Sequence, residues 1–296
     1  MKLVFDIGGT NIRRAVLDGS EFLAIDKHGT GGGDLKEGDL QTTLSDLIAQ
    51  TMQKYTIDFI GASFAGQVNH GVISSAPNIE IGSLKNANFG EWIYETFKCQ
   101  GAIDNDLKCA ALAESSLRTN ARSIFTLFVG TGIGGAIVEN GALVRGAANN
   151  AGEIGHIPFE QTPFLCGCGG GECLEASGSG IAITKWARHY GLDAQILSDL
   201  ERISAEQSLS DRSQKAYEIL ERFDRAIAHA VKTIAALFNP EYIVLGGGVA
   251  AANDRVLATA LNALETAFKP SRDIKIELST LGDRANLLGA SLLKYS

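Results

Sequence analysis

The sequence predicts an α/β protein of two lobes with a cleft between them, because a strand, a glycine turn and a second strand begin each half of the chain. In the first half, an expected strand over 3–7 leads into the glycine turn 8–10. In the second half, an expected strand over 123–129 leads into the glycine turn 130–135. The 296 residues suffice for two such lobes with separate cores. No low-complexity linker separates the halves, and we place their boundary near residues 119–123.

Further elements follow from apolar runs and from the helical spacing of apolar residues. The first half is expected to continue with strands over 12–17 and 22–26, a loop over 29–33, a helix around 40–48, a buried strand over 57–64, a short strand over 102–104 and a helix over 107–117. The second half is expected to continue with a strand over 136–139, helices between 181 and 237 that end before Pro240, a strand over 242–245, a glycine turn over 246–248 and a helix over 249–268. The apolar spacing over 219–234 indicates a helix face in the core or at a dimer contact rather than at a cofactor.

The composition excludes several classes of function. Hydrophobic residues make up 45% and charged residues 20% of the chain, as in ordinary soluble globular proteins. No apolar run approaches the roughly 18 residues that a membrane span needs. A net charge of −8 argues against nucleic acid as the main partner. The N-terminus does not resemble a secretion signal, and five cysteines do not indicate a disulfide framework, so we expect a cytoplasmic protein without membrane or nucleic-acid partners.

Glycine turns that follow strands indicate phosphate binding. Successive backbone N–H groups in such a turn form a concavity for an anion, which can approach only where side chains are absent. Asp6 precedes the first turn and is expected to hold Mg²⁺, usually through water, while Thr10 and Thr131 supply hydroxyl groups. The third turn, 246–248, is expected to border a nucleotide base or ribose. An ordinary tight turn is the alternative for each one alone, and none of them ends in the Gly-Lys-Ser/Thr of a P-loop.

One histidine and three cysteines lie close together within residues 152–175. His156, Cys166, Cys168 and Cys173 supply four nitrogen and sulfur donors, the number and kind that fill a closed tetrahedral zinc site. A disulfide or a redox pair is the alternative for the cysteines. Because four protein ligands leave no open position, the zinc is expected to be structural. Coordination of one ring nitrogen of His156 would fix the orientation of the other.

A carboxylate at the junction of a strand and a helix is the candidate catalytic group. Asn105 and Asp106 follow the expected strand over 102–104 and begin the next helix. Phosphoryl transfer needs one base to take the proton of the attacking hydroxyl, while the rest of the protein positions the groups. A helix N-cap is the alternative role for both residues, since Asn and Asp are favoured there.

Together, the glycine turns, the Asn105-Asp106 pair and the His–Cys strip resemble the ROK family of sugar kinases and repressors, from Asp6 to Leu293. The resemblance implies the actin/hexokinase-like ATPase fold, which is ribonuclease H-like. It implies an N-terminal lobe over 1–120, a C-terminal lobe over 121–282, and a last helix within 283–296 that packs back on the first lobe.

The same resemblance implies roles for individual residues. Asp106 matches the catalytic base. The residues that match sugar contacts are Gly66, Gln67, Asn78, Asn105, Glu153, His156 and Glu175. ATP with Mg²⁺ is expected at Asp6, Gly8, Gly9, Thr10, Asn11, Gly130, Thr131, Gly132, Gly134, Gly135 and Gly247.

The chain departs from the family pattern at Ala65, where the family usually has Pro, at Glu172, where it has Gly, and at two further places close to the expected site. Leu107 and Lys108 stand where the family usually has Ala-Asn, and Lys108 is expected either to perturb the pKa of Asp106 or to extend to solvent. Residues 79–82 lack the tryptophan that often follows the position of Asn78 in the family, so the bound sugar can differ from glucose.

We therefore expect an ATP-dependent hexokinase of the glucokinase type, which phosphorylates the 6-hydroxyl of a hexose. Glucose is the leading candidate, and N-acetylglucosamine, N-acetylmannosamine and fructose are alternatives. The alternatives from other classes are a sugar-responsive repressor and a non-catalytic sugar sensor or actin-like assembly protein. Only five residues precede Asp6, so the DNA-binding winged helix that family repressors carry there is not expected. The resemblance also implies a homodimer or a homotetramer.

Overall fold

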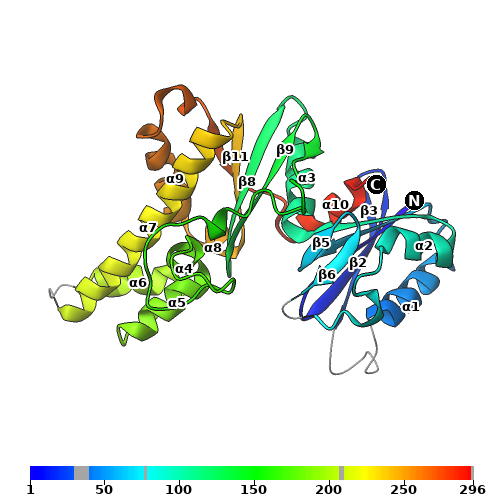
Figure 1. Ribbon diagram of the computed structural model, residues 1–296, viewed down its shortest axis with the longest axis horizontal. Coiled ribbons are helices and arrows are strands. Elements are labelled where there is room, and N and C mark those ends of the chain that lie inside the picture. The colour runs from blue at the N-terminus through cyan, green and yellow to red at the C-terminus, as the bar shows by residue number, and fades with distance from the viewer. Residues whose placement is uncertain (30–39, 77–78, 207–209, 295–296) are drawn as a thin grey trace. The chain divides into compact units, whose positions relative to one another are not determined.

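The computed structural model of the protein describes residues 1–29, 40–76, 79–206 and 210–294 (Figure 1). The chain divides into two compact units. Unit 1 comprises Met1–Thr119, Gly141–Ala151 and Leu281–Ser296, and unit 2 comprises Asn120–Asn140 and Gly152–Thr280. Gly141–Ala151 was expected in the second lobe, but it belongs to unit 1. Among the described residues, no helix is long and apolar enough to cross a membrane.

Unit 1 is built on a five-stranded mixed sheet with the order β3-β2-β1-β4-β7. Its strands are β1 (Lys2–Ile7), β2 (Asn11–Asp18), β3 (Glu21–Gly29), β4 (Phe59–Phe64) and β7 (Gln100–Asn105). The first three pair antiparallel as hairpins, and β1, β4 and β7 pair in parallel. The expected strands of the first half are thereby confirmed. Of the loop expected over 29–33, residues 30–33 lie outside the described part of the chain, and Gly29 ends β3.

Helices cover both faces of the unit 1 sheet. They are α1 (Leu40–Met52), α2 (Phe89–Phe97), α3 (Asp106–Leu117) and α10 (Ala285–Leu292), with a small hairpin of β5 (Gln67–Asn69) and β6 (Val72–Ser75) and short 3₁₀ turns at Gly82–Leu84 and Gly282–Arg284. Side chains of β1 alternate between the faces, so that Leu3 joins the core beneath α1 and Val4 joins the core beneath α10. Strands covered on both faces are apolar throughout, which is why β1 and β4 read as continuous hydrophobic runs.

Close packing of α10 on α3 depends on one glycine. A Cβ at Gly289 would overlap the carbonyl oxygen of Cys109, so only glycine lets the two helix backbones approach this closely. The C-terminal helix thus contacts the same unit as the N-terminal strands.

Unit 2 is built on the strands β9, β8, β11 and β12, which follow one another in this order in a sheet of order β10-β9-β8-β11-β12, whereas β10 (Ala142–Leu143) lies in the segment that belongs to unit 1. The strands of unit 2 are β8 (Ser123–Val129), β9 (Ile133–Glu139), β11 (Tyr242–Gly246) and β12 (Lys275–Leu278). The hairpin of β8 and β9 is antiparallel, whereas β11 pairs in parallel with β8 and β12. The expected strands of the second half are confirmed, except that β9 begins at Ile133, earlier than expected.

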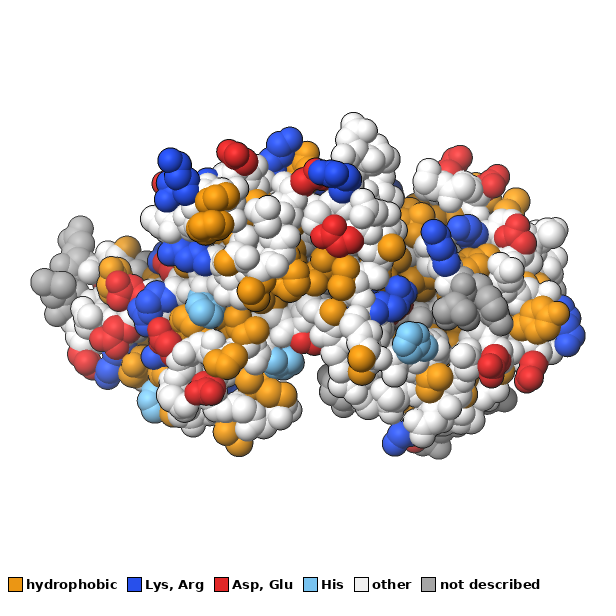
Figure 2. Space-filling view, turned by 45° about the horizontal axis from the view of Figure 1, so that its top comes forward, with side chains coloured by type: hydrophobic (Ala, Val, Ile, Leu, Met, Phe, Trp, Pro, Cys, Tyr) orange, Lys and Arg blue, Asp and Glu red, His pale blue; other side chains and the backbone are white. Residues whose placement is uncertain are grey.

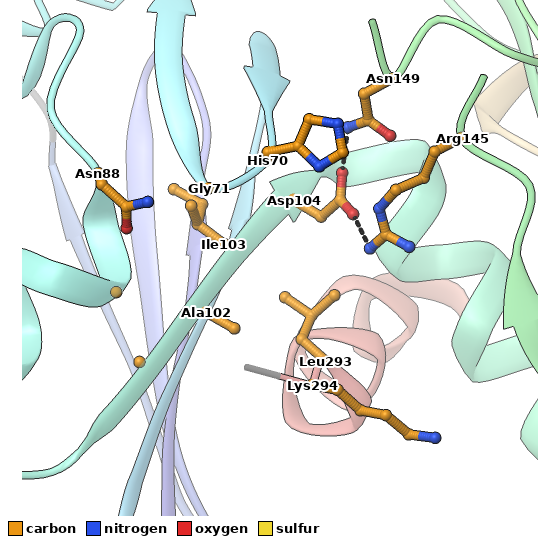
Figure 3. A pocket seen from close by; sticks show the side chains of 12 residues that line it. His70, Gly71, Asn88, Ala102, Ile103, Asp104, Arg145, Asn149, Leu293 and Lys294 are labelled. Carbon is orange, nitrogen blue, oxygen red and sulfur yellow. Dashed lines mark hydrogen bonds and ion pairs between the residues drawn. The ribbon is translucent and has the colours of Figure 1, made fainter. Parts of the chain in front are cut away.

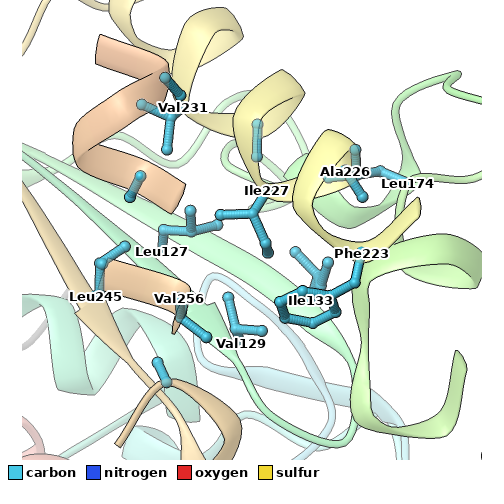
Figure 4. Close-up of a cluster of buried hydrophobic side chains, with 14 of the residues drawn as sticks. Leu127, Val129, Ile133, Leu174, Phe223, Ala226, Ile227, Val231, Leu245 and Val256 are labelled. Atoms are coloured by element: carbon cyan, nitrogen blue, oxygen red, sulfur yellow. The ribbon is translucent and has the colours of Figure 1, made fainter. Parts of the chain in front are cut away.

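The helices of unit 2 form its core with this sheet. They are α4 (Glu175–Gly178), α5 (Gly180–His189), α6 (Leu197–Ser204), α7 (Asp211–Leu237), α8 (Gly248–Ala252) and α9 (Asp254–Glu265), with 3₁₀ turns at Ile154–His156 and Lys269–Ser271. The apolar face of α7, including Phe223, Ile227 and Val231, is buried against β8 residues (Figure 4). The core interpretation of this face is therefore confirmed.

The single helix expected over 249–268 is wrong. Asn253 is extended, with φ −148° and ψ 118°, and separates α8 from α9. Its side chain accepts a hydrogen bond from the backbone N–H of Arg255 at 2.8 Å. An N-cap in this position satisfies an N–H group that the first turn of α9 would otherwise leave unpaired.

The surface shows mixed charge. On the face drawn in Figure 2, acidic and basic side chains are interspersed among polar and apolar ones, without a continuous basic stripe. A basic stripe is the usual electrostatic footprint of a nucleic-acid-binding protein.

Candidate active site

The structure places Asn105 and Asp106 at the junction of β7 and α3 in unit 1. Asn105 is the N-cap of α3, since its Oδ1 accepts a hydrogen bond from Leu107 N at 3.0 Å. Its Nδ2 donates to the carbonyl oxygen of Gly66 at 3.1 Å. The N-cap alternative is therefore correct for Asn105, which also links this junction to the expected sugar loop. Asp106 is the first residue of the helix itself.

Burial shapes the acidity of Asp106. Desolvation, with a smaller contribution from the nearby charge of Asp6, raises the pKa of its carboxyl to about 6, against the opposing effect of hydrogen bonds that include one from Leu107 N at 2.9 Å. A carboxylate whose pKa lies close to neutrality is well matched to accept a proton from a hydroxyl at physiological pH. The pKa of Asp106 therefore lies in the range in which a carboxylate can accept a proton near neutral pH.

Asp6 lies at the end of β1 in a dense set of hydrogen bonds. Arg13 donates to its Oδ2 from Nε at 3.0 Å and from Nη2 at 2.6 Å. Ser63 Oγ and Asn286 Nδ2 donate to its Oδ1 at 3.1 and 3.0 Å. Both carboxylate oxygens are engaged, so Mg²⁺ would be held here through water rather than by direct coordination. Arg13 also forms an ion pair of 3.2 Å with the exposed Asp283.

The first glycine turn connects β1 and β2 beside Asp6. Gly8 N donates to the carbonyl oxygen of Asn11 at 2.9 Å, which closes the turn. Asn11 Nδ2 donates to Thr10 Oγ1 at 2.9 Å. The turn residues Gly9 and Thr10 are exposed, as a phosphate site requires.

The expected sugar loop follows β4. A Cβ at Gly66 would lie 2.5 Å from the carbonyl oxygen of Ser75, so the turn requires glycine. Gln67 is exposed, and its Oε1 accepts a hydrogen bond from Ser75 Oγ at 3.0 Å. Asn78, the further expected sugar contact, lies outside the described residues.

Lys108 is buried. Only 1% of its surface is exposed, so the alternative in which it extends to solvent is wrong. The side chain lies on the first turn of α3, two residues after Asp106, where solvent is excluded.

The second glycine turn, in unit 2, is shorter than expected. Gly130 N donates to Gly132 O at 3.0 Å, and the strand begins directly afterwards. Gly134 and Gly135 therefore lie within β9 and not in the turn, which corrects their expected place. A Cβ at Gly135 would lie 2.6 Å from the ring of Phe125, so packing on the neighbouring strand explains that glycine.

The turn 130–132 borders a cavity of about 430 Å³ in unit 2. The cavity is lined by this turn, the start of α5, the start of α6 and the segment around α8, including Thr131, Ile181, Gln195, Ile196, Gly248 and Val249. Gly247, which precedes the lining residue Gly248, has φ +90°, and a Cβ there would lie 2.5 Å from the carbonyl oxygen of Val129. The size of the cavity and its mostly apolar lining suit a ligand such as a nucleoside. Sequence reasoning identified the glycines of this cavity but missed its apolar walls.

The four candidate metal ligands lie together in unit 2. His156, Cys166, Cys168 and Cys173 each present one donor atom, and all these atoms lie within 4.8 Å of one another. His156 Nδ1 is 3.6 Å from Cys166 Sγ, and the other two Sγ atoms are 3.4 Å apart. Tetrahedral zinc with bonds of about 2.0–2.3 Å separates its ligand atoms by roughly 3.3–3.8 Å. The four side chains therefore fit a zinc ion.

The expected sugar contacts of unit 2 lie beside this cluster. Glu175 Oε2 accepts a hydrogen bond from Ile133 N at 2.9 Å, and its Oε1 accepts one from Cys166 Sγ at 3.4 Å. Glu175 thereby joins the second glycine turn to the candidate metal ligands. Glu153 is exposed and precedes the 3₁₀ turn that carries His156, whose N–H donates to Glu153 O at 3.1 Å.

Two mixed α/β units of this kind, each with a glycine turn after its first strand, define the actin/hexokinase-like fold. A model of the ROK family matches residues 3–296, and the chain belongs to this family. It is 30% identical to a glucokinase from Halalkalibacterium halodurans over 97% of this chain and 93% of that one. It is 28% identical to an N-acetylmannosamine kinase from Haemophilus influenzae over 98% of this chain and 93% of that one.

A solved structure agrees with this assignment. The ROK hexokinase from Thermus thermophilus superposes with a TM-score of 0.80 at 27% identity, covering 98% of this chain and 96% of that one.

Proposed function

We propose that the protein is an ATP-dependent hexokinase that transfers the γ-phosphoryl group to the 6-hydroxyl of a hexose. The main support is the position and acidity of Asp106, a carboxylate at the β7–α3 junction with a pKa of about 6. Its neighbour Asn105 links this junction to the loop at Gly66 through a hydrogen bond. Membership of a family with glucokinase and N-acetylmannosamine kinase members supports it.

In the proposed reaction, the Asp106 carboxylate accepts the proton of the sugar 6-hydroxyl as that oxygen bonds to the γ-phosphorus. The bond between the γ-phosphorus and the bridging oxygen breaks, and ADP leaves. Mg²⁺, held through water near Asp6, would neutralise charge on the phosphates. The candidate contacts for sugar hydroxyls are Asn105, Gly66, Gln67 and Asn78 of unit 1, and, taken separately, Glu153, His156 and Glu175 of unit 2.

In unit 2, the nucleoside would bind in the cavity of about 430 Å³ and phosphate at the turn 130–132, and in unit 1 the turn 8–10 is the candidate phosphate site. The apolar side chains of Ile181 and Val249 would contact the base, and the glycines around 247 would leave room for the ribose.

Among hexoses we propose glucose as the substrate, with N-acetylmannosamine as the second candidate. Support comes from the 30% and 28% identity to kinases of these two names. The test is ADP release with glucose, N-acetylglucosamine, N-acetylmannosamine, mannose, fructose and allose, each against a control without sugar. No sugar-dependent release with any of the six would refute the kinase proposal. Turnover of N-acetylmannosamine alone would refute glucose.

We further propose that His156, Cys166, Cys168 and Cys173 bind a structural zinc ion. The donor separations on this cluster support it. Because Nδ1 of His156 faces the cysteines, its Nε2 would be the ring nitrogen left for the sugar. Metal analysis of unchelated protein tests the site. About one zinc per chain is expected, and a content near zero would refute it.

A further inference from the structure

Asp104, next to the catalytic pair, is a buried carboxylate with three hydrogen-bond donors. It is 2% exposed. Its Oδ1 accepts from Asn105 N at 2.8 Å and from Asn149 Nδ2 at 2.7 Å. Its Oδ2 accepts from Arg145 Nη2 at 2.6 Å. Figure 3 shows Arg145 and Asn149 converging on Asp104 from the segment Gly141–Ala151.

Asn149 has a second partner in the same unit. Its Nδ2 also donates to the carbonyl oxygen of Val68 at 2.7 Å. Val68 follows directly after Gly66 and Gln67, so one amide group joins the end of β7 to the loop expected to bind sugar. Asn105 forms a parallel link from the same strand end to Gly66 O. The loop is therefore held at two points, Gly66 O and Val68 O, by the side chains of two residues that each also donate a hydrogen bond to Asp104: Asn105 through its backbone N–H and Asn149 through its side chain.

The orientation of the Asn149 amide follows from its surroundings. Both of its neighbours, Val68 O and the Asp104 carboxylate, are acceptors, so the NH₂ group must face them. Asn149 is 4% exposed and has a φ of +60°, a left-handed conformation in which asparagine is among the few favoured residues. The Asn149 side chain is therefore held in one orientation between Val68 and Asp104.

We propose that Asn149 is a positioning residue for the reaction, which fixes the sugar loop at Gly66–Val68 against the Asn105–Asp106 junction. The inference rests on the proposed function, because it assigns the sugar to that loop. Asn149 acts through Val68 and Asp104 and does not touch the reacting atoms. Arg145, which contacts the other oxygen of Asp104, supports the same arrangement from a partly exposed position.

The test compares Asn149→Gly with Asn140→Gly. Glycine adopts a positive φ freely, so both variants keep the backbone and remove only the side chain. Asn140 has a φ of +50° but is exposed and has no part in the network, which makes it a matched control. Rates would be measured with glucose and with N-acetylmannosamine, and unfolding midpoints would be recorded for each variant.

For Asn149→Gly we expect kcat/KM for the sugar to fall about 10- to 100-fold, as for a misplaced reacting group. KM for ATP should stay unchanged, and Asn140→Gly should match the wild type. A folded Asn149→Gly variant with the kcat/KM of the control would overturn the inference. So would an equal rise in the KM values for sugar and ATP, since that indicates general disorder rather than loss of positioning.

Two further experiments, on Arg145→Ala and by calorimetric titration, test the role of Asn149 if Asn149→Gly does not fold or if the wild type lacks turnover. Arg145→Ala changes a side chain that is 37% exposed, and should lower kcat/KM for the sugar without changing KM for ATP. An unchanged kcat/KM in that variant would count against the network. If the wild type shows no turnover, the kinase proposal fails, and calorimetric titration with the same sugars decides whether Asn149→Gly weakens binding. Equal affinity, or no binding by the wild type, would overturn the positioning role.

Discussion

Replacing Asp106 by asparagine should make the protein more stable and almost inactive. A tenfold change in an ionisation constant corresponds to about 1.4 kcal/mol, so raising the pKa from 3.8 to about 6 makes the charged carboxylate about 3 kcal/mol less favourable in the folded state. Asparagine carries no charge and keeps an oxygen for Leu107 N, which donates to Asp106 at 2.9 Å. We therefore expect the free energy of unfolding to rise by about 1–3 kcal/mol at pH 8.

The stability difference between Asp106→Asn and the wild type should depend on pH, in a direction set by the raised pKa of Asp106. Below about pH 4 the carboxyl is protonated in both the folded and the unfolded wild type, so Asp106→Asn should have no stability advantage there. Between pH 4 and 6 the unfolded chain ionises first, and wild-type stability falls relative to the variant. Above pH 6 both states are ionised and the difference is constant. Urea denaturation of both proteins at pH 4, 6 and 8 measures this directly.

The kinase activity of Asp106→Asn should fall, although its stability rises. Loss of a general base typically lowers the rate about 10²- to 10⁴-fold. In the wild type, kcat/KM should decline below about pH 6, where Asp106 is protonated. The matched control is Asp104→Asn at the same strand end, which should lower the free energy of unfolding by about 1–3 kcal/mol because it disturbs satisfied hydrogen bonds to a charge. Equal stability of Asp106→Asn and wild type at pH 8, or wild-type turnover in the variant, would refute the reasoning.

Three other expectations concern packing and the metal. Gly289→Ala should lower the free energy of unfolding by more than about 3 kcal/mol, because the new Cβ would overlap the backbone of Cys109. The control Gly29→Ala, where a Cβ would have nothing within 4 Å, should change the free energy of unfolding by less than about 0.5 kcal/mol. Equal urea midpoints for the two variants would contradict the close packing at Gly289. Gly132→Ala should raise KM for the sugar, because its Cβ would overlap the Glu175 carboxylate and displace it, and an unchanged KM in steady-state assays would count against that contact. Removal of the proposed zinc with a chelator should lower the thermal midpoint of unfolding and raise KM for the sugar, while KM for ATP stays unchanged. Identical kinetics of metal-free and metal-containing protein would show that the cluster does not affect sugar binding.

The fold was predictable from the sequence because its signals are local. Continuous apolar runs correspond to strands such as β1 and β4, which are covered on both faces. The break between α8 and α9 was also predictable in principle, because Asn253-Asp254 is an N-cap signal within a helical pattern. The earlier start of β9 was not predictable, because Gly134 and Gly135 are typical of a turn in the sequence, and the contact of Gly135 with the ring of Phe125 is visible only in the structure.

The candidate site was predictable where its motif is contiguous, as in the His–Cys cluster. It was not predictable where partners come from distant parts of the chain. Arg13 becomes the partner of Asp6 through the register of β1 and β2, in which the two residues are directly opposed. Asn286 reaches the same carboxylate from α10, 280 residues later. A hairpin assignment could have indicated Arg13, but no local pattern indicates Asn286.

Asp104 and Asp106 show most clearly what the environment adds to the sequence. They stand two residues apart at one strand end and are chemically identical. Asp104 accepts three hydrogen bonds, including one from the cationic Arg145, so its lone pairs are committed to structure. Asp106 also accepts hydrogen bonds, one of them from Leu107 N at 2.9 Å, but desolvation and the nearby charge of Asp6 outweigh them and raise its pKa to about 6. Asp106 can therefore take up a proton near neutral pH, whereas the hydrogen bonds of Asp104 hold the strand end against Asn149 and Arg145.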